Sequence, residues 1–449
     1  MVSSVYLRII SVIAVVSLVL SIAASPYVLL FNIRGHACYS IVAGKKIAVC
    51  GWIESSEKPV GFVALVGEKV EWFTLVEEVY ELRKIAVLGE KLVVCGSWFI
   101  GSFDLWNGDL EWGYSSGTWL NDLLILPNMN IFVCGVGYVA LLSSSGKILL
   151  ERVFNVVRPD GTSAKPFFFA ATLVGDKVVL AGAVFNVLSR SSGLDCLVVC
   201  ISLKDLKVLW AKCFGGKSHD RLYGVCCKDK LIYVTGHTLS HFSLRQEAVV
   251  ACFSTDGEMK WCRVLFSKAW CYGVSVFSAQ AVYVVGLSES YGVKKTVFVA
   301  ELAEGNGDLL ELFEVKLGKY TTLTLGSHIE GLSKGILVSC SNGSPLVVYW
   351  PLGFEGSFKL DNSSKLVVER GKFNSSPWNA AIKEVKISVS VGRMLFKENF
   401  QVKKINVEIV QRGELPVLEE KYLDLRLILL TLVCAVAVLL LLFKRFKRS

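Results

Sequence analysis

The chain has 449 residues, of which 53% are hydrophobic and 19% charged, and its mean hydropathy is +0.51. This composition excludes an intrinsically disordered chain, and it is too apolar for an average cytosolic protein, so it indicates a connection with a membrane. The net charge of +9 is concentrated at the two ends, and residues 26–422 keep only +4, which argues against a clustered nucleic-acid-binding surface.

The N-terminal residues 1–25 have the pattern of a secretory signal. Arg8 precedes the uncharged stretch 9–24, and small residues follow at Ala23 and Ala24. Because Pro26 is unfavourable directly after a cleavage point, an uncleaved N-terminal anchor is an open alternative. Either segment directs the chain out of the cytosol.

The chain between residues 26 and 360 contains an internal repeat. Each unit has a polar turn, an apolar run, a small residue and then a glycine. The units end at Gly51, Gly96, Gly135, Gly182, Gly236, Gly286 and, in a degenerate copy, Cys340, which places them 39 to 54 residues apart. Such spacings are typical of four-stranded units. They predict an all-β fold: a seven-bladed β-propeller of four-stranded antiparallel blades over residues 26–360.

Tight turns and large side chains recur in the second half of most units. Asn-Gly, Asp-Gly or Ser-Gly pairs, which favour two-residue hairpins, end at Gly108, Gly146, Gly257 and Gly307. A bulky residue follows in corresponding places, namely Trp112, Leu150, Trp210 and Trp261. We expect these side chains to dock one blade against the next.

One unit resembles a known family. Phe214-Gly215-Gly216, then Asp220 and Tyr223-Gly224-Val225, then Tyr233-Val234-Thr235-Gly236, are similar to the SBBP-type β-propeller repeat. The run 206–210 is similar to the tryptophan-docking motif of quinoprotein-like propellers. The resemblance spans roughly residues 36–360, mostly by pattern, and it implies a fold rather than an activity.

Two further segments are needed to complete the β-structure. Residues 27–33 resemble an outermost strand without a preceding hairpin, so we expect them to pair into the last blade and close the ring. Residues 385–391 and 405–409 alternate between apolar and polar side chains, which is typical of strands with one face exposed to solvent. The segment 361–422 is therefore predicted to be a β-rich stalk near the membrane, or else an eighth, degenerate blade.

The C-terminal segment 423–443 is predicted to be a single transmembrane helix. It is almost uncharged, with Arg426 close to its start, and its length approaches the ~20 residues that cross a bilayer. Residues 444–449 contain four cations and form a basic tail that stays cytoplasmic. The propeller is thus expected outside the cytoplasm at the cell membrane.

Glycosylation and disulfide bonds are candidate modifications at such a location. Sequons begin at Asn342, Asn362 and Asn374. Cys200 and Cys213 flank one hairpin, and Cys252 and Cys262 flank another, so these two pairs are candidate disulfides. Cys50, Cys95 and Cys134 share one place in the repeat, and we expect them to be small buried side chains.

No group of residues has the spacing of a catalytic or metal site. Cys226-Cys227 resembles the vicinal disulfide of quinoprotein alcohol dehydrogenases, but it falls inside a predicted strand, where the two side chains face opposite ways. His237 and His241 have no third ligand. Asp220, beside His219, is interpreted as a turn residue that accepts backbone N–H groups. We therefore predict no catalytic residue, no metal and no bound cofactor.

The leading functional hypothesis is a membrane-anchored binding or scaffold module for a protein or a glycan. Its loops would make the contact, and Trp98, Phe99, Tyr114 and Trp119 are candidate contact residues unless they pack between blades. One alternative is a quinone-cofactor-dependent dehydrogenase with an active site on the propeller axis. Another is an assembly or structural protein of the cell envelope.

Overall fold

The computed structural model describes residues 27–188, 193–241, 245–290 and 293–317, and then shorter stretches between 329 and 412. All of them belong to one compact unit, residues 1–416, which is separate from residues 417–449. The predicted segments 1–25, 423–443 and 444–449 lie outside the described residues. Within the described stretches, no helix has the length and apolar character needed to cross a membrane.

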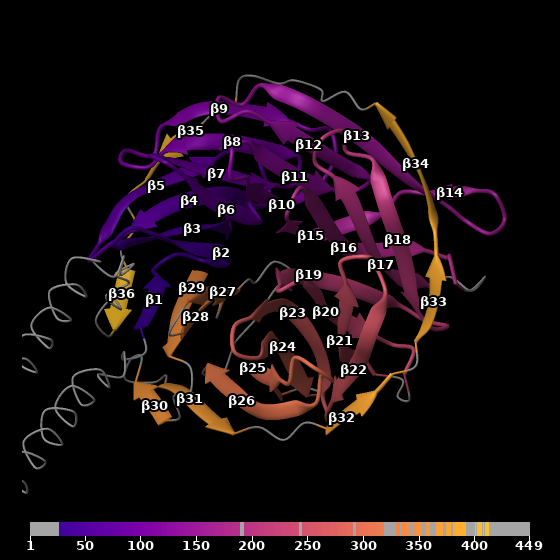
Figure 1. The fold of residues 1–449 in the computed structure, drawn as a ribbon. Helices are drawn as coiled ribbons and strands as arrows, with labels where there is room; N and C mark the ends of the chain where they lie inside the picture. Colours follow the sequence, from indigo (N-terminus) through magenta and orange to yellow (C-terminus); the bar gives the residue numbers. More distant parts are fainter. Residues whose placement is uncertain are drawn as a thin grey trace, which may run out of the picture. The chain divides into compact units, whose positions relative to one another are not determined.

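The described residues form seven antiparallel sheets, numbered here in chain order (Figure 1). Sheet 1 contains β2 (Gly35–Ala43), β3 (Lys46–Ile53), β4 (Val60–Val66) and β5 (Val70–Val76). Sheet 2 contains β6 (Lys84–Leu88), β7 (Lys91–Gly96), β8 (Phe99–Asp104) and β9 (Leu110–Ser115). Sheet 3 contains β10 (Leu120–Ile125), β11 (Ile131–Gly135), β12 (Tyr138–Leu142) and β13 (Ile148–Val157), with the short β14 (Ser163–Ala164) beside it.

The next sheets repeat this order. Sheet 4 contains β15 (Phe167–Val174), β16 (Lys177–Phe185), β17 (Leu194–Ser202) and β18 (Val208–Gly215). Sheet 5 contains β19 (Asp220–Lys228), β20 (Leu231–Thr238), β21 (Glu247–Ser254) and β22 (Met259–Phe266), and sheet 6 contains β23 (Trp270–Ser278), β24 (Val282–Ser290), β25 (Val293–Leu302) and β26 (Leu309–Leu317). The all-β arrangement of four-stranded, propeller-like sheets predicted from the repeat is confirmed.

Sheet 7 joins the two ends of the ring. It contains β27 (Ile329–Leu332), β28 (Gly335–Ser341) and β29 (Pro345–Pro351), and its next strand is β1 (Tyr27–Phe31), from the other end of the chain. Leu29 of β1 pairs with Val347 of β29. The prediction that residues 27–33 close the ring is confirmed. The first strand of each sheet contacts that of the next, including β27 with β2, so the sheets surround one axis.

Apolar cores lie between neighbouring sheets, because the central strands of each sheet bury both faces. In β17, for example, Val198 and Cys200 pack towards sheet 5, whereas Leu197 and Val199 pack towards sheet 3. This two-sided burial explains the almost continuous apolar runs in the sequence.

The repeated glycine is required by a close approach between backbones. In five sheets the first strand has a β-bulge opposite this glycine. A Cβ atom at Gly182 would lie 1.7 Å from the Phe167 carbonyl oxygen, and one at Gly236 would lie 1.8 Å from that of Arg221. Only glycine leaves room for these carbonyl groups.

Tryptophans dock sheets 1, 2, 4 and 5 against the next sheet, and for Trp112, Trp210 and Trp261 this docking was predicted. The Trp210 indole lies over Gly257 of sheet 5 and its Nε1 donates to the Thr255 carbonyl oxygen (2.9 Å), and Trp261 meets sheet 6 in the same way. Trp112 lies over Gly146. Trp72 docks on sheet 2 in the same manner, but its different spacing from the preceding turn hid it in the sequence.

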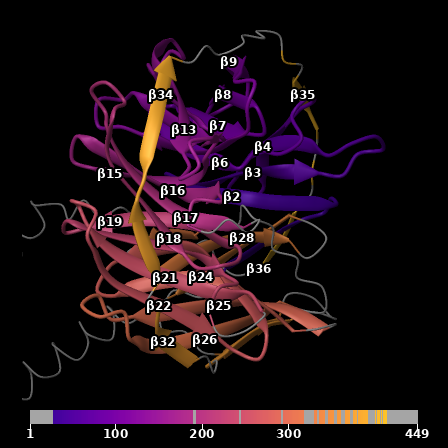
Figure 2. The ribbon, with the colours of Figure 1, turned by 90° about the vertical axis from the view of Figure 1, so that its right-hand side faces the viewer.

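The last part of the chain forms a belt around the ring, which we define as the strands β30–β36 (Figures 1 and 2). The belt strands are β30 (Gly356–Lys359), β31 (Lys365–Arg370), β32 (Asn374–Pro377), β33 (Ala381–Glu384), β34 (Lys386–Val391), β35 (Val402–Lys404) and β36 (Ile409–Arg412). From β31 onwards they extend the outer edges of sheets 6, 5, 4, 3, 1 and 7, in that order.

This belt differs from both the stalk and the eighth blade that were expected for residues 361–422. The expected alternation is present, because Ile387 and Val389 pack on the core between sheets 3 and 4 while Lys386 and Ser388 are exposed. The same pattern suits an edge strand laid on an existing sheet, where one face of the strand meets the ring and the other meets solvent. At sheet 2, Phe400 packs on Phe99 with ring centroids 4.7 Å apart.

Candidate functional site

A cavity lies on the ring axis, between the first strands of six sheets. It has about 660 Å³ of empty space, including open solvent at its edge. Its lining mixes polar and aromatic side chains, including Tyr39, Arg83, Lys84, Asp122 and Tyr223. Several of these residues stand at or beside the bulges of the first strands, so the bulges turn side chains towards the axis.

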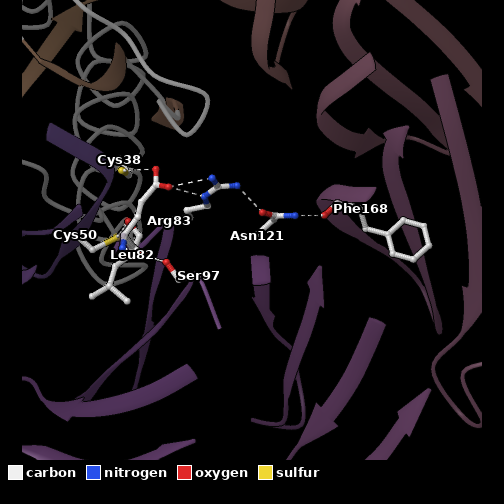
Figure 3. A network of polar contacts seen from close by, with 8 residues as sticks. Cys38, Cys50, Leu82, Arg83, Ser97, Asn121 and Phe168 are labelled. Atoms are coloured by element: carbon white, nitrogen blue, oxygen red, sulfur yellow. Dashed lines mark hydrogen bonds and ion pairs between the residues drawn. The ribbon is translucent and has the colours of Figure 1, made fainter. Parts of the chain in front are cut away.

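A network of polar contacts connects sheets 1 to 4 at this cavity (Figure 3). Two nitrogens of Arg83, Nε and Nη2, donate to Glu81 Oε2 (3.0 and 2.9 Å), and a third, Nη1, donates to Asn121 Oδ1 (2.6 Å). Asn121 Nδ2 donates in turn to the Phe168 carbonyl oxygen (2.8 Å). At the other end, Cys38 Sγ donates to Glu81 Oε1 (3.5 Å), and burial raises the pKa of this thiol well above its ordinary value.

A second ion pair lies beside this network. Lys84 Nζ is 3.0 Å from Asp122 Oδ1, and both side chains are largely buried. The other carboxylate oxygen, Oδ2, accepts the N–H of Ala171 in sheet 4 (2.8 Å), while the Lys84 ammonium lies over the Tyr39 ring, 4.2 Å from its centroid. Each charged residue that lines the cavity thus has an opposite charge as its partner, and the bonds of these pairs join four sheets. This arrangement favours a structural role for these carboxylates over catalysis.

Next to the cavity-lining Arg83 is a group of aromatic rings, which we call the aromatic patch: Tyr80, Trp98 and Trp119, with Trp98 half-buried between the other two. Tyr80 and Trp98 meet edge to face at 5.0 Å, and Trp98 and Trp119 do so at 6.2 Å. Trp119 is 40% exposed and Tyr80 37%. Arg83 lies 5.2 Å from the Trp119 centroid and Lys58 lies 5.5 Å from that of Tyr80. The patch therefore combines aromatic surface with two cations.

The connections between strands place this patch on one face of the ring. Its residues lie in the connections 77–83, 97–98 and 116–119, at the end where the first strands begin. The turns at the other end of these sheets include 89–90 and 105–109. Because successive antiparallel strands reverse direction, these connections lie on one face of the ring. The cavity-lining Lys84 and Asp122 stand at or near the start of their strands, towards the same face.

Of the four aromatic residues singled out in the sequence, two belong to the patch, Trp98 and Trp119. Phe99 is fully buried and follows the alternative expectation of packing between blades: its side chain faces the opposite way from that of Trp98, lies in the core between sheets 1 and 2 and packs on Phe400. Tyr114 is half-buried and stacks on Trp112. Sequence reasoning missed Tyr80, Arg83 and the Lys84–Asp122 pair. Charged residues at or near the start of otherwise apolar strands, such as Lys84 and Asp122, could have pointed to the axial site.

The candidate disulfide cysteines are free thiols in the structure. Cys200 lies opposite Trp210 and packs towards sheet 5, whereas Cys213 lies opposite Leu197 and packs towards sheet 3. Cys252 and Cys262 also face opposite sides of their sheet. A bridge needs side chains that point towards each other, so this geometry brings neither pair together.

Five other cysteines singled out in the sequence follow the packing interpretation. Cys50, Cys95 and Cys134 are fully buried in the cores between sheets, and burial raises their pKa values well above the ordinary value. Cys226 packs on the core between sheets 5 and 6, and Cys227 on the core between sheets 4 and 5. The two neighbours therefore face opposite ways, as expected for a strand.

The histidines and Asp220 are also accounted for by local structure. His237 is buried between Tyr223 and Tyr272, and burial, with a smaller contribution from Arg221, lowers its pKa to about 3. Asp220 accepts the Gly216 N–H (2.8 Å), as predicted for a turn residue, and burial raises the pKa of its carboxyl. No cluster of three metal-ligating side chains occurs among the described residues.

Of the three sequons, only the one at Asn374 lies within the described residues. Asn374 is exposed at the start of β32. Asn342 and Asn362 lie outside the described residues. Glycosylation at all three positions stays a prediction.

Neither a protein-family model nor a curated protein matches the sequence. Among solved structures, the chain is similar to BamB from Moraxella catarrhalis (12% identity, covering 71% of this chain and 94% of that chain, TM-score 0.38). It is also similar to Sqt1 from Chaetomium thermophilum (9% identity, 74% and 98% covered, TM-score 0.45) and to the AfRom2 CNH domain (8% identity, 74% and 100% covered, TM-score 0.43). It is the chain's own strand pairing that gives it the architecture of a β-propeller.

Proposed function

We propose that this chain is a seven-bladed, membrane-anchored propeller that binds a protein partner outside the cytoplasm through the aromatic patch. The observation that carries the proposal is the cluster of Tyr80, Trp98 and Trp119, of which Tyr80 and Trp119 are exposed, with two cations beside it. Tyr, Trp and Arg dominate the energetically important positions of protein interfaces. A glycan ligand is the alternative for the same surface.

The rest of the site supports binding more than chemistry. The charged residues that line the cavity each have an opposite charge beside them, and the bonds of Arg83 and Asp122 extend across sheet boundaries. These bonds hold the connections that carry the patch, so the patch is presented on a rigid frame. A preorganised surface of this kind loses less conformational entropy when it binds.

The anchor and the location are proposed from the sequence. Residues 1–25 supply a signal or an N-terminal anchor, 423–443 supply the transmembrane helix, and 444–449 supply the cytoplasmic tail. Protease treatment of intact cells tests the location. We expect cleavage in exposed connections of the ring while the C-terminal tail stays protected, and the opposite pattern would contradict the location.

Site-specific photo-crosslinking tests the binding surface. A photoreactive amino acid replaces Trp119 in the full-length protein in its native membrane, and a matched control replaces Trp106, which is 61% exposed and lies in the turn 105–109 on the other face. We expect a discrete protein adduct from position 119 that is absent from position 106 and that weakens when Tyr80 is changed to Ala. Identical adducts from both positions, or none from position 119, would contradict the proposal; transfer of the label to carbohydrate would identify a glycan.

A further inference from the structure

One group of polar side chains lies away from the axis, where the belt meets sheet 5. His241 follows β20, Glu247 begins β21, and Ser376 belongs to the belt strand β32. His241 Nδ1 lies 2.7 Å from Glu247 Oε2, and its Nε2 lies 3.2 Å from Ser376 Oγ. The belt therefore brings a hydroxyl, an imidazole and a carboxylate together in series, although Ser376 is 135 residues from His241 in the chain.

These contacts define the protonation of the neutral imidazole. A carboxylate accepts hydrogen bonds, so Glu247 holds the proton on Nδ1. Nε2 is then the acceptor, and the Ser376 hydroxyl donates to it. This is the order of bonds that activates a serine hydroxyl: the base is within reach of the nucleophile, and a third group orients the base.

Burial separates the roles of the three residues. The His241 and Glu247 side chains are 3% and 6% exposed, so the imidazole and its carboxylate are held inside the protein. Ser376 is only half-buried, on the outermost strand of its sheet among the described strands. The base is thus shielded from solvent, while the serine lies on the strand at the outer edge of the sheet.

The surroundings favour a neutral acyl substrate. The Phe266 ring lies 6.0 Å from that of His241 and gives the site an apolar side. Of the two strand neighbours of Ser376, only Ser375 has an N–H, because Pro377 has none; a backbone donor on an edge strand is suited to stabilising an oxyanion.

We propose that Ser376, His241 and Glu247 form a serine esterase site that takes carboxylic esters with small acyl groups. Ser376 Oγ attacks the acyl carbon and His241 Nε2 takes the hydroxyl proton. The ester C–O bond breaks, and the leaving alcohol receives that proton. Water then attacks the acyl-serine, returns a proton through Nε2 to Ser376 Oγ, and releases the carboxylic acid.

Labelling with a fluorophosphonate probe tests this site in the full-length protein in detergent. We expect the phosphonyl group on Ser376, located by mass spectrometry of the digested protein. Ser376→Ala should remove the label, and the neighbouring Ser375→Ala should keep it as a matched control. His241→Gln should slow labelling at least about 100-fold, and Glu247→Gln at least about tenfold.

Turnover of p-nitrophenyl acetate should follow the same order among the variants. A folded wild-type protein that is unlabelled at Ser376 would overturn the proposal, and so would labelling at equal rates in the wild type and a folded His241→Gln variant. If His241→Gln does not fold, the labelling rate of Glu247→Gln relative to that of the wild type decides whether the proposal holds. A purely structural clasp between belt and ring would give no label at all. The proposed binding function is independent of this result.

Discussion

The Lys84–Asp122 pair on the ring axis allows a quantitative test of whether the axial charges are structural. Asp122→Asn leaves the ammonium without its counter-charge, and Lys84→Met leaves the carboxylate with two backbone N–H donors, those of Leu123 and Ala171. Removing one partner of a buried ion pair costs about 3–5 kcal/mol. We expect Asp122→Asn to lower the free energy of unfolding by about 3 kcal/mol, because Lys84 is 15% exposed and keeps some hydration. Lys84→Met should lower it by about 2 kcal/mol.

The double variant decides whether the two residues act as a pair. Residues in direct contact couple by about 0.5–3 kcal/mol, so Asp122→Asn with Lys84→Met should lose about 1–3 kcal/mol less than the sum of the single variants. The assay is denaturant unfolding of the full-length protein in detergent, followed by tryptophan fluorescence. Additive losses, or single variants as stable as the wild type, would refute the structural role of this pair.

Three further predictions test the frame of the ring. Trp210→Phe should cost about 1 kcal/mol through loss of the bond to Thr255, and an unchanged denaturation midpoint would contradict the docking role. Gly236→Ala should lower the free energy of unfolding by about 3 kcal/mol, because its Cβ would meet a carbonyl oxygen. Gly305→Ala, with open space around it, should leave stability nearly unchanged. Equal losses from the two variants would contradict this explanation. His237 stays neutral down to about pH 3 in the folded chain, whereas in the unfolded chain it binds a proton near pH 6.5. Between these two pH values, each unit of acidification should therefore lower the free energy of unfolding by about 1.4 kcal/mol. His237→Gln should flatten the pH profile of unfolding by one proton.

The ring was predictable because its signals are local. Turn residues such as Asn107-Gly108 and the glycine at the end of each unit mark hairpins and close backbone contacts within about fifty residues. The seam was also predictable, since residues 27–33 form an apolar strand with no neighbouring hairpin. Strand alternation and turn chemistry suffice for such features.

The belt and most of the site were not predictable, because they depend on pairings that are distant in sequence. Residues 386–391 alternate in the same way whether they belong to a stalk or extend sheet 3, and only the register with β13 distinguishes the two. Likewise, Ser376 reaches His241 only because β32 pairs with β22. Trp98 in the patch and Phe99 in the core are neighbours in the sequence, and their side chains point to opposite faces of the sheet. Composition alone does not determine which of two adjacent residues faces the core.

Closure of the ring by the first strand of the chain is the central claim, and directed disulfide formation tests it most directly. We would introduce two cysteine pairs at residues that are opposite each other in the β1–β29 register, Val28→Cys with Val348→Cys and Leu29→Cys with Val347→Cys. Adjacent pairs of an antiparallel ladder alternate between hydrogen-bonded and non-hydrogen-bonded geometry, so one of the two should suit a bridge. After mild oxidation of the folded protein, mass spectrometry should find a peptide from β1 linked to one from β29. If neither pair links, while Val49→Cys with Ala64→Cys in the β3–β4 register does, the ring is not closed in this way.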